Sequence, residues 1–221
     1  MRRREFILRS GAAALALWES GSAWAQDATS PGEAKRTRMC VSSWSFRRLF
    51  KPKASATQTK RLDVLDFPEM IADRFHVHNV EIVSPHFASS ERSYVEEFKD
   101  QLRKARSQLI NVPIDYDELW EKAALSSPDP RERGHAISLY MRGIDLAAAL
   151  GSPTARCDPG TVNLDDPALT ISSYKTLVSY GKSKGVGIIV ENHGGGISQH
   201  IEVLVKILQA SGAGALPDIG K

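Results

Sequence analysis

The stretch that most constrains the fold is residues 185–196, Gly-Val-Gly-Ile-Ile-Val-Glu-Asn-His-Gly-Gly-Gly. Apolar residues occupy both alternating sets of positions until Glu191, which falls on the same face as Ile189. This pattern predicts a parallel strand that is covered on both sides. Catalytic and metal-binding groups gather at the carboxyl ends of such strands. Because Glu191, Asn192 and His193 cluster there before three glycines, we interpret Glu191 as a functional acid. The alternative is an acid that only caps a following helix.

The rest of the chain repeats the order strand then helix. Strands are predicted at 39–44, 79–84, 109–115, 154–160, 186–191 and 215–218, with Pro113 marking a strand end or bulge. Helices are predicted from Asp66 to about Phe75, at 93–108, 127–151 and 167–182, and after a capping Ser198. The segment 47–61 holds six basic residues without an acid, and we predict a long loop there. Its basic side chains are either solvated or in contact with a phosphate or acidic sugar.

Alternation of this kind predicts an α/β fold with parallel strands, either a doubly wound sheet or a (β/α)8 barrel. No strand is followed by a dinucleotide-binding glycine pattern. Polar residues instead end nearly every predicted strand, and several strands that contribute side chains to one rim favour the barrel. These residues are Ser43, Ser84, His86, Asp115, Arg156, Asp158, Glu191, His193 and Asp218.

The N-terminal residues predict export. Arg3 and Arg4, followed by Glu-Phe-Ile-Leu, resemble a bacterial twin-arginine signal, and Ala-Trp-Ala at 23–25 is a typical cleavage site. The apolar run between them is too short for a stable membrane anchor. We therefore divide the chain into a signal peptide at 1–25, a polar linker at 26–37 and the barrel at 38–221, and we expect a periplasmic protein.

Composition narrows the function. The chain carries 29 basic and 26 acidic residues; without residues 1–25, 25 basic and 24 acidic residues remain. A domain so close to neutral gives no electrostatic reason to expect a nucleic-acid partner. The two cysteines, Cys40 and Cys157, lie in strand-like segments, where a small buried side chain is the default and a disulfide in an oxidising compartment is the alternative.

Four segments carry a family resemblance: 80–84, 156–160, 188–195 and 217–220. Together they resemble the xylose isomerase-like TIM barrels, and more narrowly the exported sugar phosphate isomerase/epimerase branch. The resemblance spans roughly residues 38–221. It implies one divalent metal held by two Glu, an Asp and a His, of which Glu191 and Asp218 match two. The other two have no counterpart, so we expect a barrel that is truncated after about strand 6.

The resemblance implies a metal-dependent isomerase or epimerase that acts on a sugar or sugar derivative. Carboxylates with an imidazole suit Mn, Mg, Co or Zn, and the metal would polarise a carbonyl while Glu191 moves a proton on the neighbouring carbon. The alternative is a non-catalytic barrel remnant or a sugar-binding module. A DNA-repair endonuclease is disfavoured by the export signal and the near-neutral charge. Monomer and homo-oligomer both remain open.

Five further residues are candidates for substrate binding. Glu81 and His86 could contact substrate hydroxyls, and His193 could act as a ligand, a substrate contact or a loop hydrogen-bonder. Arg156 could pair with a phosphate or carboxylate, or internally with Asp158 or Asp115. Trp44 could form a wall against a sugar ring or lie in the core.

Overall fold

The computed structural model describes residues 31–50, 62–121, 124–192 and 197–219. The predicted signal peptide, residues 51–61 of the basic segment 47–61, and His193 lie outside the described residues. Among the described helices, none is long and apolar enough to cross a membrane.

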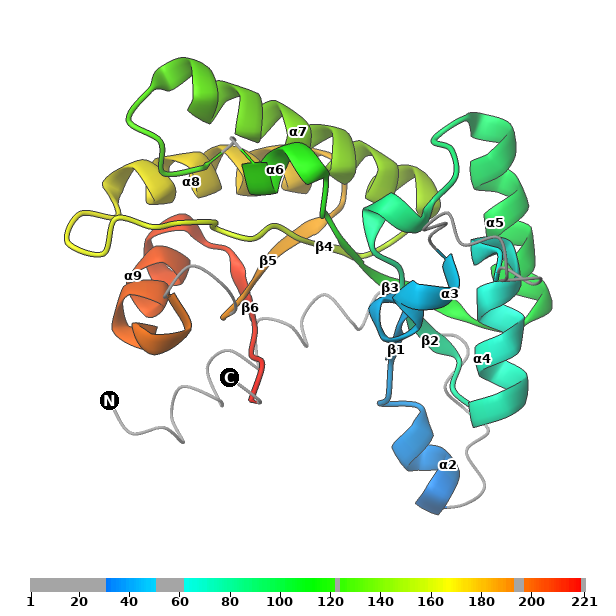
Figure 1. Cartoon of the computed structure of the whole chain (residues 1–221). Helices are drawn as coiled ribbons and strands as arrows, with labels where there is room; N and C mark the ends of the chain where they lie inside the picture. The colour runs from blue at the N-terminus through cyan, green and yellow to red at the C-terminus, as the bar shows by residue number, and fades with distance from the viewer. Residues whose placement is uncertain (1–30, 51–61, 122–123, 193–196, 220–221) are drawn as a thin grey trace.

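A six-stranded parallel sheet organises the described chain, with its strands in sequence order (Figure 1). Each strand pairs with the next along the chain, which confirms the predicted α/β fold class. The strands are β1 (Val41–Ser42), β2 (Asn79–Glu81), β3 (Gln108–Pro113), β4 (Thr154–Arg156), β5 (Gly187–Glu191) and β6 (Gly214–Leu216).

Helices connect the strands and cover one side of the sheet, with α7 and α8 over β4 and β5 in Figure 1. The α-helices are α2 (Pro31–Arg36), α3 (Arg47–Phe50), α4 (Phe67–Phe75), α5 (Arg92–Lys104), α6 (Asp117–Glu121), α7 (Pro130–Leu150), α8 (Ala168–Ser183) and α9 (Ile201–Ser211). Short 3-10 turns are η1 (Ser43–Phe46), η2 (Val64–Asp66), η3 (Ser84–His86) and η4 (Ile197–Gln199).

The two faces of the sheet differ in chemistry because successive side chains of a strand point to opposite sides. One set is apolar, fully buried and packed under the helices; it includes Val80, Val112, Ala155, Ile188 and Val190. The alternate set forms what we call the polar face: Glu81, Asn111, Thr154, Arg156 and Glu191. The fold therefore directs its strand-borne polar groups to the side away from the helices.

Two glycines allow the helices to approach the apolar face closely. A Cβ atom on Gly143 of α7 would lie 2.6 Å from the side chain of Ile114, which is too short for a real contact. A Cβ atom on Gly181 of α8 would lie 2.5 Å from the backbone oxygen of Val186, just before β5. Only a residue without a side chain fits at these two helix–strand contacts.

Most helix boundaries agree with the sequence patterns. Asp129 caps α7 by accepting a hydrogen bond from the Arg131 amide (2.8 Å), and α7 ends at Gly151 in the left-handed conformation. Asp66 is the N-cap residue of α4, but without a side-chain cap bond. Ser198 was expected to cap the last helix, and this is wrong. It lies within η4, whose Ile197 is fully buried, and α9 begins only after His200.

The first predicted strand is longer than the observed one. Strand pairing covers only Val41–Ser42, because the Ser42 side chain accepts a hydrogen bond from the Trp44 amide (3.2 Å) and turns the chain into η1. The second predicted strand, 79–84, is also longer than the observed one, because β2 ends at Glu81 and η3 begins at Ser84. Two other segments were expected to lack helix, yet α2 lies in the predicted linker and α3 in the predicted loop.

Both cysteines are free thiols in the structure. Cys157 is fully buried on the helix-covered side, as expected for a small apolar side chain. The expected burial of Cys40 is wrong, because Cys40 lies exposed just before β1. The alternative of a disulfide between them is not observed.

Candidate active site at the carboxyl ends of the strands

A chain of hydrogen bonds crosses the polar face at the level of the strands. The Asn111 side-chain amide donates to Glu81 Oε2 (2.7 Å), and the Thr154 hydroxyl lies 3.0 Å from Asn111 Oδ1 and 2.8 Å from the Ile110 carbonyl oxygen. These three polar side chains come from β2, β3 and β4, which are neighbours in the sheet. Glu81, the last residue of β2, is therefore held at the level of Asn111 and Thr154, one layer of side chains below Arg156.

A charged cluster lies one level higher, around Arg156. Its Nη2 is 3.2 Å from Asp115 Oδ2 and 3.2 Å from Asp158 Oδ2, and its Nη1 donates to Glu191 Oε2. The four side chains retain only 7–16% of their solvent exposure. They follow or end three adjacent strands, so the convergence of polar strand ends that favoured the barrel is present at β3, β4 and β5.

The electrostatics of the cluster keep Arg156 charged. Burial by itself lowers the pKa of Arg156, but Asp158, Asp115 and Glu191 outweigh this effect and raise the pKa above its ordinary value. Each terminal nitrogen of the guanidinium faces a carboxylate, the paired geometry for which arginine is suited. Of the two interpretations of Arg156 left open by the sequence, the structure contains the internal ion pairs.

Two buried tyrosines support the turn that carries Asp158. The Tyr140 hydroxyl donates to the Asp158 carbonyl oxygen (2.7 Å), and the Tyr174 hydroxyl donates to the Cys157 carbonyl oxygen (2.6 Å). Burial is the main cause that raises the pKa of both tyrosines well above the ordinary value. Both therefore remain hydrogen-bond donors across the physiological pH range and fix the backbone after β4.

Asn192 connects the ends of β5 and β6. Its side-chain amide donates to the Asp218 carbonyl oxygen (2.9 Å), and its side-chain oxygen accepts from the Asp218 amide (2.5 Å). In the sheet register Glu191 pairs with Leu216, two residues before Asp218. Asn192 is only 8% exposed. This two-point contact fixes the backbone of Asp218 at the strand end beside that of Glu191.

The donor chemistry of Glu191 and Asp218 fits a hard divalent cation, since both supply carboxylate oxygens at neighbouring strand ends. The number of donors is smaller than such a cation needs. Among the residues that the structure describes, no group of three or more His, Cys, Asp or Glu side chains is arranged to hold a metal ion.

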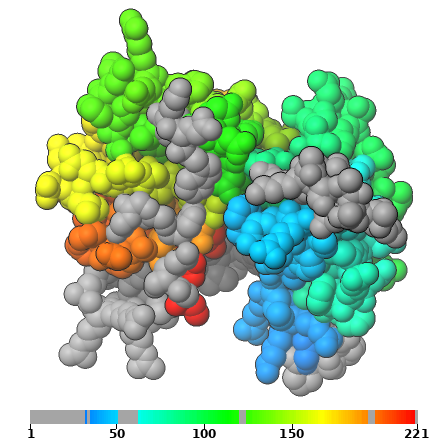
Figure 2. Space-filling model, in the orientation of Figure 1, coloured from blue at the N-terminus to red at the C-terminus, as the bar shows by residue number. Residues whose placement is uncertain are grey.

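The structure gives the other predicted substrate contacts different surroundings. His86 is 9% exposed; its Nδ1 forms a hydrogen bond with the Ser43 hydroxyl (2.9 Å), and its ring lies 4.6 Å from that of Phe50. Trp44 is 51% exposed, so the alternative of a core tryptophan is wrong. The Arg47 guanidinium lies over the Trp44 ring at 4.9 Å, and the blue segment after β1 forms part of the visible surface (Figure 2).

Three residues of this region received no functional role from the sequence, although Ser43 was counted among the polar strand ends. Asn111 holds Glu81, Asn192 holds Asp218, and Ser43 accepts from the Val83 amide (3.0 Å) while bonding His86. A signal existed for Asn111, because it alternates with Pro113 and Asp115 on one face of the predicted strand 109–115. Asn192 was part of the clustered motif but received no role.

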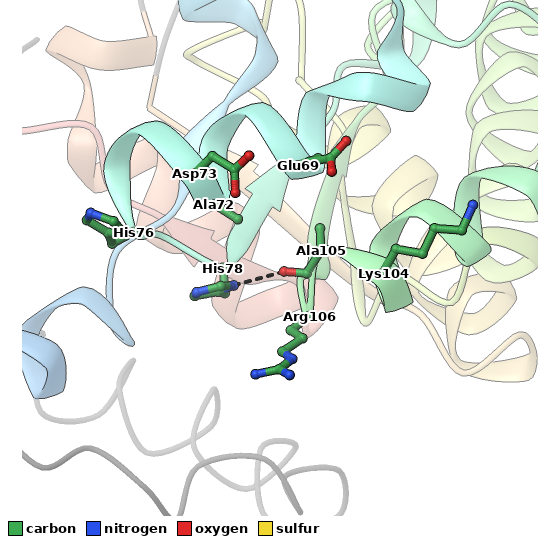
Figure 3. Close-up of a pocket in the computed structure, with 8 residues that line it drawn as sticks. All are labelled: Glu69, Ala72, Asp73, His76, His78, Lys104, Ala105 and Arg106. Atoms are coloured by element: carbon green, nitrogen blue, oxygen red, sulfur yellow. Dashed lines mark hydrogen bonds between the residues drawn. The ribbon is translucent and has the colours of Figure 1, made fainter.

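A cavity of about 410 Å³ lies at the amino ends of β2 and β3, away from the Arg156 cluster (Figure 3). His78 precedes β2 and Arg106 precedes β3, so this cavity is at the amino ends; the Ala105 carbonyl oxygen is 3.1 Å from His78 Nδ1. Functional sites of parallel barrels lie at the carboxyl ends. We therefore place the candidate site at the Arg156 cluster and not in this cavity. The cavity is lined by Glu69, Ala72, Asp73, His76, His78, Lys104, Ala105 and Arg106.

Comparison with known proteins now identifies the architecture. The model of the xylose isomerase-like TIM barrel family matches residues 71–220, more than half of the chain. The chain belongs to this family. The predicted family and the predicted TIM-barrel type are thereby confirmed. A comparison with curated protein sequences gives no significant match.

Solved structures of xylose isomerase-like proteins share the fold at low sequence identity. A xylose isomerase domain protein from Planctomyces limnophilus superposes with a TM-score of 0.57 at 12% identity, over 82% of this chain and 62% of its own. D-psicose 3-epimerase from Clostridium cellulolyticum H10, solved with D-tagatose, gives 0.56 at 16%, over 71% and 57%. The 3-keto-D-glucoside 4-epimerase from E. coli gives 0.53 at 11%, over 74% and 64%. The chain thus spans less than two thirds of each of these proteins.

Proposed function

We propose that this xylose isomerase-like chain carries the site of an isomerase or epimerase that acts on a sugar by moving a proton next to a carbonyl group. The observation that carries the proposal is the convergence of Arg156, Asp115, Asp158 and Glu191 at the carboxyl ends of adjacent strands. Family membership supports it, as do structural neighbours that are sugar epimerases by name.

Glu191 is the residue we propose for proton transfer. Its carboxylate ends β5 on the polar face, and the guanidinium of Arg156 holds Oε2 in place. A carboxylate fixed in this way can take a proton from a substrate carbon next to the carbonyl group and return one. Asp115 and Asp158 hold the other side of the guanidinium, so the orientation of Glu191 depends on all three partners.

We also propose that Glu191 and Asp218 contribute two ligands to a divalent metal site. A bound cation would supply Lewis-acid polarisation of the substrate carbonyl. The contribution of this chain is to keep the two strand ends side by side, through the β5–β6 pairing and the contact of Asn192 with the Asp218 backbone.

Solvent hydrogen exchange tests the proposed chemistry. The protein would be incubated with Mn²⁺ and D-fructose in D₂O, and deuterium incorporation next to the carbonyl would be followed by NMR. We expect incorporation with the wild type and about a 100-fold or greater loss in Glu191→Gln, since general base catalysis typically contributes that much. Glu97→Gln, an exposed acid on α5, is the matched control. Exchange that Glu191→Gln leaves unchanged would exclude Glu191 as the base.

A sugar-binding module without catalysis is the second candidate. The observation that favours it is the small number of donors for a metal among the described residues. The same samples separate the two functions. Saturable D-fructose binding without any deuterium incorporation would support the binding module, whereas incorporation supports the enzyme.

A further inference from the structure

We propose that the Arg156 cluster makes this site selective for uncharged sugars over phosphorylated ones. This inference rests on the proposed function and names its substrate class. It concerns Arg156, the side chain that a phosphate-binding site would be expected to use, because arginine is well suited to phosphate recognition.

Both terminal nitrogens of Arg156 already contact carboxylates of the protein. One terminal nitrogen contacts Glu191, and the other lies 3.2 Å from both Asp115 and Asp158. The side chain is 11% exposed. A phosphate could reach the guanidinium only by displacing carboxylates that come from three different strand ends.

Displacement would also be unfavourable for the carboxylates. A buried carboxylate that loses its guanidinium partner keeps the cost of its own desolvation. The incoming phosphate would bring further negative charge next to the displaced acids, and like charges at close range repel. Exchange of a carboxylate for a phosphate therefore gains no new type of contact and adds repulsion.

The neighbouring groups fit hydroxyls better than anions. Arg156 is the one basic side chain among the described strand residues on the polar face; the others are acidic, amide, hydroxyl or apolar. Carboxylate oxygens accept hydrogen bonds from sugar hydroxyls and offer no donor to a phosphate. A polyol without charged substituents matches this surface.

The test compares D-fructose with D-fructose 6-phosphate by isothermal titration calorimetry on the full chain. We expect the phosphate ester to bind about 10-fold or more weakly, because like-charge juxtaposition suppresses wrong ligands. Asp115→Asn, which removes one of the two carboxylates at Nη2 of Arg156, should narrow this difference. Asp165→Asn, in an exposed loop, should leave it unchanged. An ester that binds the wild type as tightly as the sugar overturns the proposal, and this comparison needs no variant to fold.

A second titration, with inorganic phosphate, tests the role of Arg156 independently of the proposed function. We expect that any phosphate binding by the wild type does not depend on Arg156, so Arg156→Met should leave it unchanged. Circular dichroism checks that the variant is folded. Phosphate binding that Arg156→Met abolishes identifies Arg156 as an anion receptor and overturns the inference. If neither sugar binds and no Arg156-dependent phosphate binding occurs, the proposed function falls, while Arg156 stands as the internal partner of the three acids.

Discussion

Replacing Arg156 with methionine should destabilise the protein far more than removing a surface cation. The side chain of Arg156 is 11% exposed, and those of its partners Asp115, Asp158 and Glu191 are 12%, 7% and 16% exposed. Methionine keeps much of the volume but leaves three carboxylates that have lost their shared guanidinium. Breaking a buried pair by removing one partner costs about 3–5 kcal/mol. We therefore expect Arg156→Met to lower the free energy of unfolding by about this amount.

The control is Lys99→Met on α5, which removes an ion pair with Glu96 between side chains that are 34% and 54% exposed. Exposed pairs contribute about 0–1 kcal/mol. Urea denaturation of both variants at neutral pH, followed by circular dichroism, gives the two changes in unfolding free energy. A loss in Arg156→Met no larger than the loss in Lys99→Met would refute the argument that burial makes the cluster interdependent.

Three further outcomes follow from the structure. Gly181→Ala should destabilise by about 1–3 kcal/mol because its Cβ would lie 2.5 Å from the backbone oxygen of Val186, just before β5. Gly134→Ala lies at an exposed helix position where the added Cβ would meet nothing within 4 Å, so it should stabilise by about 0.5–1 kcal/mol. Urea denaturation measures both changes. Burial raises the pKa of Tyr140 in the folded state, so the neutral hydroxyl stabilises the fold fully below about pH 10, the ordinary pKa of tyrosine. This contribution to the free energy of unfolding should be lost as the pH rises toward the raised pKa of the folded state. Ultraviolet titration should therefore show ionisation of Tyr140 only when the protein unfolds. Asn192→Ala should speed hydrogen exchange of the Asp218 amide, measured by NMR, because the acceptor of that amide is removed.

Sequence patterns predicted the sheet well because the parallel strands are short, apolar and regularly spaced. Pro113 marks the end of β3 as expected, and Glu191 ends β5 on the predicted face. The prediction that polar groups converge at strand ends also follows from local pattern plus parallel pairing. Once the strands lie in sequence order, the residues that follow Pro113, Arg156 and Val190 must meet at one edge.

The sequence offered Asp158 and Asp115 as possible partners of Arg156, and both pairs are present. It did not offer Glu191, which lies 35 residues from Arg156, so no local signal selects that partner. The length of β1 was also overestimated. The pattern of apolar residues that predicted this strand carries no information on the competing hydrogen bond from the Trp44 amide to the Ser42 side chain. Side-chain bonds to nearby backbone of this kind compete with strand pairing.

The division of chemistry between the two faces explains how the fold can hold a charged cluster. Close helix contacts at Gly143 and Gly181 place α7 and α8 directly on the apolar side of the sheet, where burial of apolar surface supplies most of the stability. The polar face is then free to keep groups whose burial is unfavourable in itself, provided that they are paired. Asn111 is paired through its side-chain amide, which donates to the Glu81 carboxylate, and Arg156 is paired by ion pairs. It follows that replacing the uncharged Asn111 should alter the placement of Glu81 more than it alters the global stability of the protein. Arg156 is the exception, because three acids depend on it at once.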